Sequence, residues 1–140
     1  MSYIDTSILV ACYCPERLSA VAQDAVRKSA SRTISPLSNV EFCSALALKT
    51  RTGETNTDSA RRVLAAFRLD RAEGVFHVVP VEAREHAVAC DWISRFTTTL
   101  RTVDALHLAA AFYNGLTLLT SDKDLARSAA RFGVKHKLIA

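Results

Sequence analysis

A chain of 140 residues with 49% hydrophobic and 23% charged side chains can bury one sizeable core. We expect a single domain over residues 1–140, because two ordinary domains would need a longer chain. Lysine and arginine total 18 against 14 acidic residues, a formal net charge of +4. This balance favours nucleic acid as a partner, although it also fits a mildly basic surface without that role.

Short β-prone runs alternate with longer amphipathic segments along the whole chain. We expect strands in a run ending at Ile4 and at residues 33–34, 75–79, 116–120 and 134–139. We expect helices from Ile8 and at about residues 15–30, 37–53, 58–73, 82–96, 103–113 and 123–132. Strands that alternate with single or paired helices indicate right-handed crossovers. The pattern predicts an α/β fold with a mostly parallel sheet covered by helices on both faces.

Nothing in the chain resembles a membrane span or an export signal. The apolar run from Val103 to Tyr113 is interrupted by Asp104 and His107 and falls well short of the roughly 20 residues that a membrane helix needs. No basic segment with a following apolar stretch opens the chain, because Asp5 interrupts it at once. We therefore expect a cytoplasmic protein that does not bind membranes.

The cysteine spacing does not indicate a metal site. Cys12 and Cys14 form one close pair, but Cys43 and Cys90 are far apart, whereas a structural zinc site usually has two close pairs. Free cysteines in a reducing compartment are usually thiols that pack in the core. We expect four packing thiols, most of them buried.

Four acidic residues fall at comparable places in the predicted pattern. Asp5 directly follows the first strand, and Asp122 follows the strand at 116–120 by two residues. Glu41 lies in the first turns of the helix after the second strand, and Asp104 lies in the first turn of its helix. Ligands bind open α/β sheets at the carboxyl edge of the strands. We expect the four carboxylates to form one site at that edge.

Carboxylates from four segments are the hard oxygen ligands that magnesium or manganese prefers. Such an ion lowers the pKa of a bound water and stabilises a leaving oxygen, so the site could hydrolyse a phosphodiester. Asp124, two residues beyond Asp122, could be a fifth ligand, a support for a ligand or a residue favoured by the helix dipole. With the acids in one pocket, the rest of the surface is basic, which suits a polyanion.

Three of the four acids also have a clear structural interpretation. Ser38 to Glu41 match an S-x-x-E capping box, and Asp104 and Asp122 fit the acids that a helix N-terminus favours. Asp5 has no such obvious capping role. The occurrence of all four acids at one edge is what favours the functional interpretation.

The polar neighbours of the acids are predicted to be structural. Thr6 and Ser7 favour capping of the helix that begins at Ile8, rather than binding of phosphate. His107 lies among apolar residues, which indicates a hydrogen-bonded core histidine rather than a catalytic base. Trp92 is expected in the core or at a dimer surface.

At these residues the sequence resembles the PIN-domain nucleases, and within them the VapC toxins of prokaryotic toxin and antitoxin pairs. The matching segments are Y-I-D-T-S-I-L-V at 3–10, S-N-V-E-F-C-S-A-L at 38–46, T-V-D-A-L-H-L-A-A-A at 102–111 and L-L-T-S-D-K-D-L-A at 118–126. The third segment is the most specific. The resemblance implies a three-layer α/β/α PIN-like domain in which Asp5, Glu41, Asp104 and Asp122 match the acidic quartet of the family.

The resemblance also implies an activity and partners. Proteins similar to this one are magnesium- or manganese-dependent endoribonucleases and usually homodimers. A VapB-type antitoxin passes a segment across their active site, often with a basic residue directed at the acids, and the complex binds its own promoter DNA through the antitoxin.

Other classes fit the chain less well. A phosphotransferase of the haloacid dehalogenase type needs a second aspartate two residues after the first, where this chain has Ser7. A receiver domain of two-component signalling needs an acidic pair and a late lysine that are not placed correctly here. The remaining alternative is a non-catalytic PIN-like binding module that regulates by association with RNA or protein.

Overall fold

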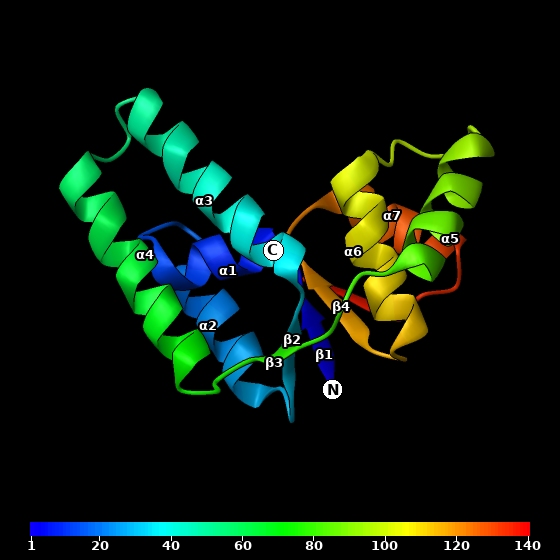
Figure 1. The fold of residues 1–140 in the computed structure, drawn as a ribbon, viewed down its shortest axis with the longest axis horizontal. Helices are drawn as coiled ribbons and strands as arrows, with labels where there is room; N and C mark the ends of the chain where they lie inside the picture. The colour runs from blue at the N-terminus through cyan, green and yellow to red at the C-terminus, as the bar shows by residue number, and fades with distance from the viewer.

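In the computed structural model, which describes residues 1–140, five parallel strands form one sheet between two groups of helices (Figure 1). The strands are β1 (Ser2–Ile4), β2 (Arg32–Ile34), β3 (His77–Val78), β4 (Thr117–Thr120) and β5 (His136–Leu138). Their order in the sheet is β3-β2-β1-β4-β5, and every neighbouring pair is parallel.

Seven helices connect the strands. They are α1 (Thr6–Tyr13), α2 (Ser19–Lys28), α3 (Pro36–Arg51), α4 (Thr57–Ala72), α5 (Ala83–Ser94), α6 (Thr102–Tyr113) and α7 (Lys123–Arg131). The chain moves from β1 through β2 to β3 in one direction, and from β3 through β4 to β5 in the other. Right-handed crossovers therefore place α1 to α4 on one face and α5 to α7 on the other (Figure 1). The predicted three-layer α/β/α fold is confirmed, and no helix combines the length and apolarity that crossing a membrane requires.

The central strand β1 contributes to both cores. Successive strand residues point to opposite faces, so Ile4 packs with α1 to α4 while Tyr3 packs with α5 to α7, and both are fully buried. β1 pairs with β2 on one side and with β4 on the other. Its carboxyl end, where Asp5 lies, is therefore held by a neighbouring strand on each side and by helices on each face.

Each core is built around aromatic side chains. On one face Phe67 of α4 packs against Phe42 with ring centroids 4.4 Å apart, and Tyr13 and Phe76 complete the cluster. On the other face Trp92 is 4% exposed and stacks on Phe132 at 5.0 Å. The expectation that Trp92 belongs to the core is confirmed.

Several expected element ends differ from the structure. The second helix begins at Ser19 rather than near Pro15, because the Ser19 hydroxyl accepts from the Glu16 backbone N–H and donates to the Cys14 carbonyl, which closes a turn. Helix α4 begins at Thr57 because the Asn56 side chain caps it, accepting from the Ser59 backbone N–H at 2.9 Å.

The expectation that most cysteines are buried is wrong, because only Cys14 is buried and Cys12 is half-buried. All four are free thiols, but Cys43 and Cys90 are exposed. The buried positions of α3 are Ser38, Phe42 and Leu46, and those of α5 are Glu85, Ala89 and Trp92. Each exposed cysteine follows a buried residue directly, and one residue turns the side chain about 100° around a helix.

We expect the substitution Phe67→Ala to lower the free energy of unfolding by about 3 to 5 kcal/mol, because it leaves a cavity among packed rings. The matched control is Phe96→Ala at a ring that is 89% exposed, where we expect a change below about 0.5 kcal/mol. Urea unfolding followed by circular dichroism measures both. Equal effects of the two substitutions would contradict this account of the core.

Candidate functional site

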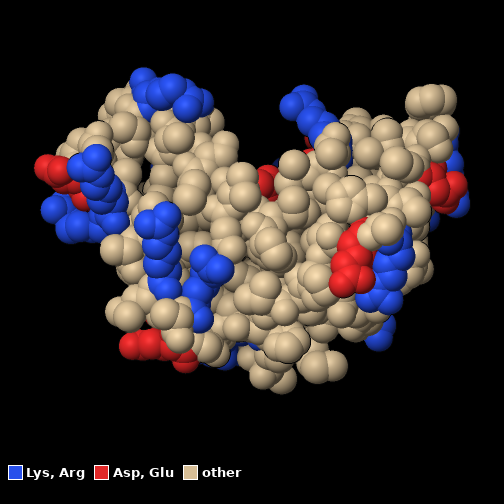
Figure 2. All heavy atoms as spheres, in the orientation of Figure 1, with Lys and Arg blue, Asp and Glu red and all other residues tan.

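A cavity of about 520 Å³ opens at the carboxyl ends of β1 and β4. These are the adjacent strands from which the chain leaves towards opposite sides of the sheet, which is where open α/β sheets bind ligands. All four predicted acids line this cavity, Asp5, Glu41, Asp104 and Asp122. Figure 2 shows acidic atoms in the hollow between two raised parts of the molecule, with lysine and arginine on both raised parts.

Asp5 is held by the ends of two neighbouring strands. Its backbone N–H donates to the carbonyl of Leu119 in β4 at 3.0 Å, which places it directly after β1. Its side-chain oxygen Oδ2 accepts from the hydroxyls of Ser7 at 2.6 Å and Thr120 at 2.8 Å. The expected capping role of Ser7 is therefore wrong, because its hydroxyl donates to a carboxylate rather than accepting from the start of α1.

Glu41 lies in the second turn of α3 and is not part of a capping box. The helix begins at Pro36 with Ser35 as N-cap, one turn before the Ser38 of the suggested capping box, and the Ser35 backbone N–H donates to the Ser38 hydroxyl at 3.1 Å. Oε1 of Glu41 accepts instead from the Thr6 hydroxyl at 2.6 Å and from Nε2 of His107. Burial acts to raise the pKa of Glu41, but these two hydrogen bonds outweigh it and lower the pKa. The expected capping role of Thr6 is wrong as well.

Asp122 has the capping role that its position suggested. Its Oδ1 accepts from the backbone N–H groups of Asp124 at 2.8 Å and Leu125 at 3.2 Å, at the start of α7. Its own backbone N–H donates to the Thr120 hydroxyl at 3.0 Å. Both capping bonds end on Oδ1, and the carboxylate still lines the cavity.

Asp104 stands out from the other three acids. Burial, and then the negative charges of Asp5, Asp122 and Glu41, raise its pKa from the ordinary value of 3.8 to about 6. No hydrogen bond to its carboxylate counteracts this shift. An ionised carboxylate in such surroundings is destabilised, so a cation in the cavity would favour the ionised form of Asp104.

The arrangement fits a divalent cation that binds oxygen. Oxygens of Asp5 and Glu41 lie within 4.8 Å of each other and of a nitrogen of His107. The protein donors to Asp5, Glu41 and Asp122 all end on one oxygen of each carboxylate. The second oxygen of each is left for another partner, which is the requirement for carboxylates that bind magnesium or manganese.

Asp124 is not brought into the cavity. Its carboxylate pairs with Arg127 one turn further along α7. It lines a separate polar hollow of about 400 Å³ together with Thr97, Thr98, Thr99 and Arg131. Only its backbone N–H reaches the site, through the bond to Asp122.

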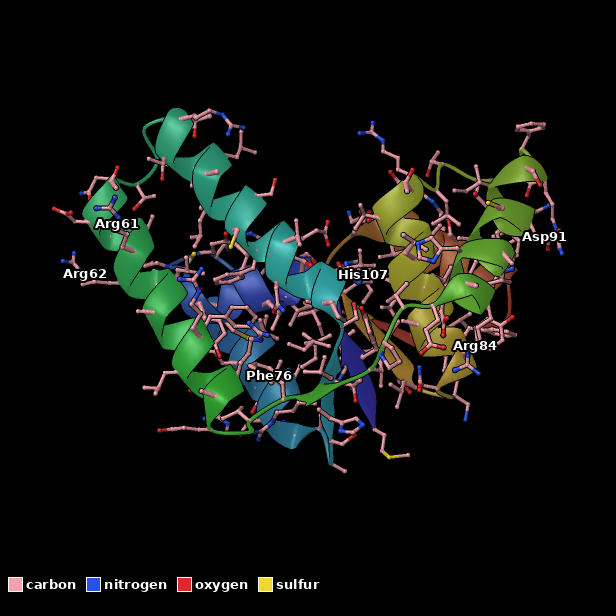
Figure 3. All side chains as sticks on the ribbon, in the orientation of Figure 1. Arg61, Arg62, Phe76, Arg84, Asp91 and His107 are labelled. Atoms are coloured by element: carbon pink, nitrogen blue, oxygen red, sulfur yellow. The ribbon has the colours of Figure 1, made fainter.

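His107 is the residue whose contact the sequence did not reveal. It is fully buried and hydrogen-bonded, as predicted, but one of its partners is the site carboxylate of Glu41. Figure 3 shows His107 between α3 and α6. Its place three residues after Asp104 on one helix is a signal, because residues at that spacing share a helix face.

Comparison with solved structures identifies the fold. VapC20 from Mycobacterium tuberculosis, described as a sarcin-ricin loop cleaving toxin, is similar with a TM-score of 0.71 and 21% identity over 91% of this chain and 95% of that chain. VapBC2 from Rickettsia felis, solved with a promoter DNA fragment, has a TM-score of 0.69 and 13% identity over 100% of both chains. FitAcB from Neisseria gonorrhoeae has a TM-score of 0.68 and 16% identity over 97% of this chain and 96% of that chain. At these identities the likeness concerns the fold.

No curated protein matches the chain significantly. The family model described as the PIN domain matches residues 2–131. This range includes the central strand β1 and the four predicted acids of the cavity. The chain belongs to the PIN domain family.

Proposed function

We propose that this protein is a metal-dependent endoribonuclease that hydrolyses RNA phosphodiester bonds and acts in the cytoplasm as a VapC-like toxin. The observation that carries the proposal is the free oxygens in one cavity. Asp5, Glu41 and Asp122 each have one carboxylate oxygen that accepts no hydrogen bond from the protein, and neither oxygen of Asp104 accepts one. Acids arranged in this way are suited to hold a cation against a phosphate, and of the four only Asp122 also caps a helix with its side chain.

Asp5, Glu41, Asp104 and Asp122 would hold magnesium or manganese. The bound ion supplies Lewis acidity, which makes water a better nucleophile and stabilises the leaving oxygen. The protein supplies position, because Ser7 and Thr120 fix Asp5 and Thr6 fixes Glu41. We leave Asp124 out of the ligand set, since its carboxylate pairs with Arg127.

Charge around the cavity supports a polyanionic substrate. The cavity extends along α3 to Arg51, which forms part of its wall. The chain as a whole is basic although five of its acids, the four predicted ones and Glu16, line this one cavity. A basic surface around an acidic floor attracts the RNA backbone and brings a phosphate to the carboxylates.

The proposal includes a partner that silences the site. The similar structures from Rickettsia felis and Neisseria gonorrhoeae are named VapBC2 and FitAcB, and the former is described with a DNA fragment from the promoter. We propose a cognate VapB-type antitoxin and, from the resemblance to VapC toxins, a homodimer. A basic side chain of the antitoxin in the cavity would neutralise Asp104, whose charge the surrounding acids oppose.

We expect partner-free protein to cleave structured RNA with magnesium or manganese and not with chelator. The substitutions Asp5→Asn and Asp104→Asn are each expected to reduce the rate by about 100-fold or more, because they remove charge from the cavity without changing its shape. The control is Asp91→Asn, at an exposed acid on the outer side of α5 (Figure 3), and its rate should match the wild type. Metal binding without turnover would instead favour the non-catalytic binding module.

We expect the products to carry a 5′-phosphate and a 3′-hydroxyl. If water attacks opposite the 3′-oxygen, the bond from phosphorus to that oxygen breaks, so the phosphate stays on the 5′ end of the downstream fragment and the upstream fragment ends in a 3′-hydroxyl. The 2′-hydroxyl takes no part. Labelled fragments treated with phosphatase or with a 5′-phosphate-dependent exonuclease distinguish the ends. A 2′,3′-cyclic phosphate would contradict attack by water.

The raised pKa of Asp104 predicts a pH-dependent effect on stability. In metal-free protein the unfolded chain releases this proton near pH 3.8 and the folded protein near pH 6, so stability falls as the pH rises through that interval. We expect Asp104→Asn to stabilise the metal-free protein by about 1 kcal/mol at pH 8, a figure reduced for the partial exposure of this side chain. The gain should shrink towards zero near pH 4.

Urea unfolding in chelator at both pH values measures this difference. Asp91→Asn is again the control, because its carboxylate is exposed and pairs with Arg95. A destabilising effect of Asp104→Asn at pH 8 would mean that the other carboxylates do not oppose its charge.

A further inference from the structure

A line of buried hydrogen bonds leads from the sheet to one carboxylate of the cavity. The Ser35 hydroxyl lies 2.8 Å from the Tyr3 hydroxyl, which lies 2.5 Å from Nδ1 of His107. Nε2 of the same ring is bonded to Oε1 of Glu41. Ser35, Tyr3 and His107 are fully buried. The line therefore connects Ser35, Tyr3 and His107, and only its last member, His107, contacts the site residue Glu41.

The chemistry of these groups fixes the direction of the last bond. An ionised carboxylate only accepts hydrogen bonds. Nε2 of His107 therefore carries the hydrogen and donates the hydrogen bond to Glu41. The Tyr3 hydroxyl both donates and accepts, and it satisfies Nδ1 in either protonation state. The ring is thus held at both nitrogens and cannot rotate without breaking two buried bonds.

His107 does not itself face the cavity. Neither it nor Tyr3 nor Ser35 is among the residues that line the cavity, although Glu41 is. His107 has a nitrogen close to Asp5 and Glu41, but the nitrogen Nε2 is already bonded to Oε1 of Glu41 and the nitrogen Nδ1 to Tyr3. Whatever His107 contributes to the site, it contributes through Glu41.

Glu41 needs such support more than the aspartates do. A glutamate has one more rotatable bond than an aspartate, and this side chain is 31% exposed. Both of its donors, Thr6 on one side and His107 on the other, end on Oε1. Fixing Oε1 from two sides determines where Oε2 points, before any ligand arrives.

We propose that His107 is a positioning residue, which holds Glu41 through Nε2–H so that Oε2 faces the cavity, with Tyr3 and Ser35 fixing the orientation of its ring. The inference rests on the proposed role of Glu41 as a metal ligand. Groups that orient a metal ligand in this way typically change metal affinity or activity about 10 to 100-fold when removed.

The test compares two substitutions of similar size. His107→Leu removes the donor, whereas His107→Gln offers an amide N–H near the place of Nε2. We expect His107→Leu to weaken Mn²⁺ binding about 10 to 100-fold, measured by electron paramagnetic resonance. His107→Gln should restore the affinity to within about threefold of the wild type, which an altered core would not do. Tyr3→Phe should fall between the two.

The matched control is Tyr13→Phe. It removes another tyrosine hydroxyl that donates to a carboxylate, that of Asp70, on the opposite side of the sheet from α6. Its Mn²⁺ affinity should equal that of the wild type. Thermal unfolding of every variant identifies those that are folded. If His107→Leu does not fold, the Mn²⁺ affinities of the wild type, His107→Gln and Tyr3→Phe test the proposal, and an affinity of Tyr3→Phe equal to that of the wild type would contradict the role of Tyr3.

The outcomes separate this inference from the proposed function. A wild-type protein that binds no Mn²⁺ and cleaves no RNA would overturn the proposed function. A wild type that binds Mn²⁺ while His107→Leu binds it equally well would overturn the positioning role alone. Nitrogen-15 spectra add a direct readout, because Nε2 should keep its proton when Mg²⁺ is added. Loss of that proton would make His107 a ligand and overturn the inference.

Discussion

Mutual repulsion between carboxylates is the constraint on which the rest of the site depends. Asp5, Glu41, Asp104 and Asp122 line one cavity, and burial together with the charges of the other three raises the pKa of Asp104. The fold tolerates this because hydroxyl, imidazole and backbone donors compensate Asp5, Glu41 and Asp122 on one oxygen each. The donors hold these three carboxylates in place. The second oxygen of each carboxylate has no partner in the protein. A cation or a basic side chain would complete what the protein leaves open.

The parallel sheet explains how distant segments reach one place. Asp5 and Asp122 follow β1 and β4, the two strands between which the chain changes direction across the sheet. Glu41 comes from a helix on one face, and Asp104 and His107 from a helix on the other. The site therefore joins the two layers of helices over the end of the sheet. Its geometry depends on how both layers pack against β1.

Much of this arrangement is predictable from the sequence. The acid directly after a short strand indicates Asp5, and the alternation of strands and helices indicates a parallel sheet with helices on both faces. Local pattern works here because strand ends and helix starts are local features. The start of the second helix at Ser19 and the exposure of Cys43 and Cys90 were not predicted, since they depend on a turn and on helix phase.

The contacts of the polar residues were beyond such reasoning. Thr6 and Ser7 fit capping by every local rule, yet their hydroxyls support carboxylates. His107 and Glu41 are 66 residues apart and meet only after both helix layers have packed. Propensity and spacing describe neighbours along the chain, whereas these bonds follow from tertiary structure.

The brevity of β1 has a consequence for how the site can fail. Three consecutive residues carry three different duties: Tyr3 supports the His107 ring, Ile4 fills the opposite core, and Asp5 enters the cavity. Side chains alternate along a strand, so a shift of β1 by one residue in its pairing would exchange the faces of Tyr3 and Ile4. The same shift would move Asp5 out of the cavity. A misregistered molecule would thus lose its core and its chemistry in the same step.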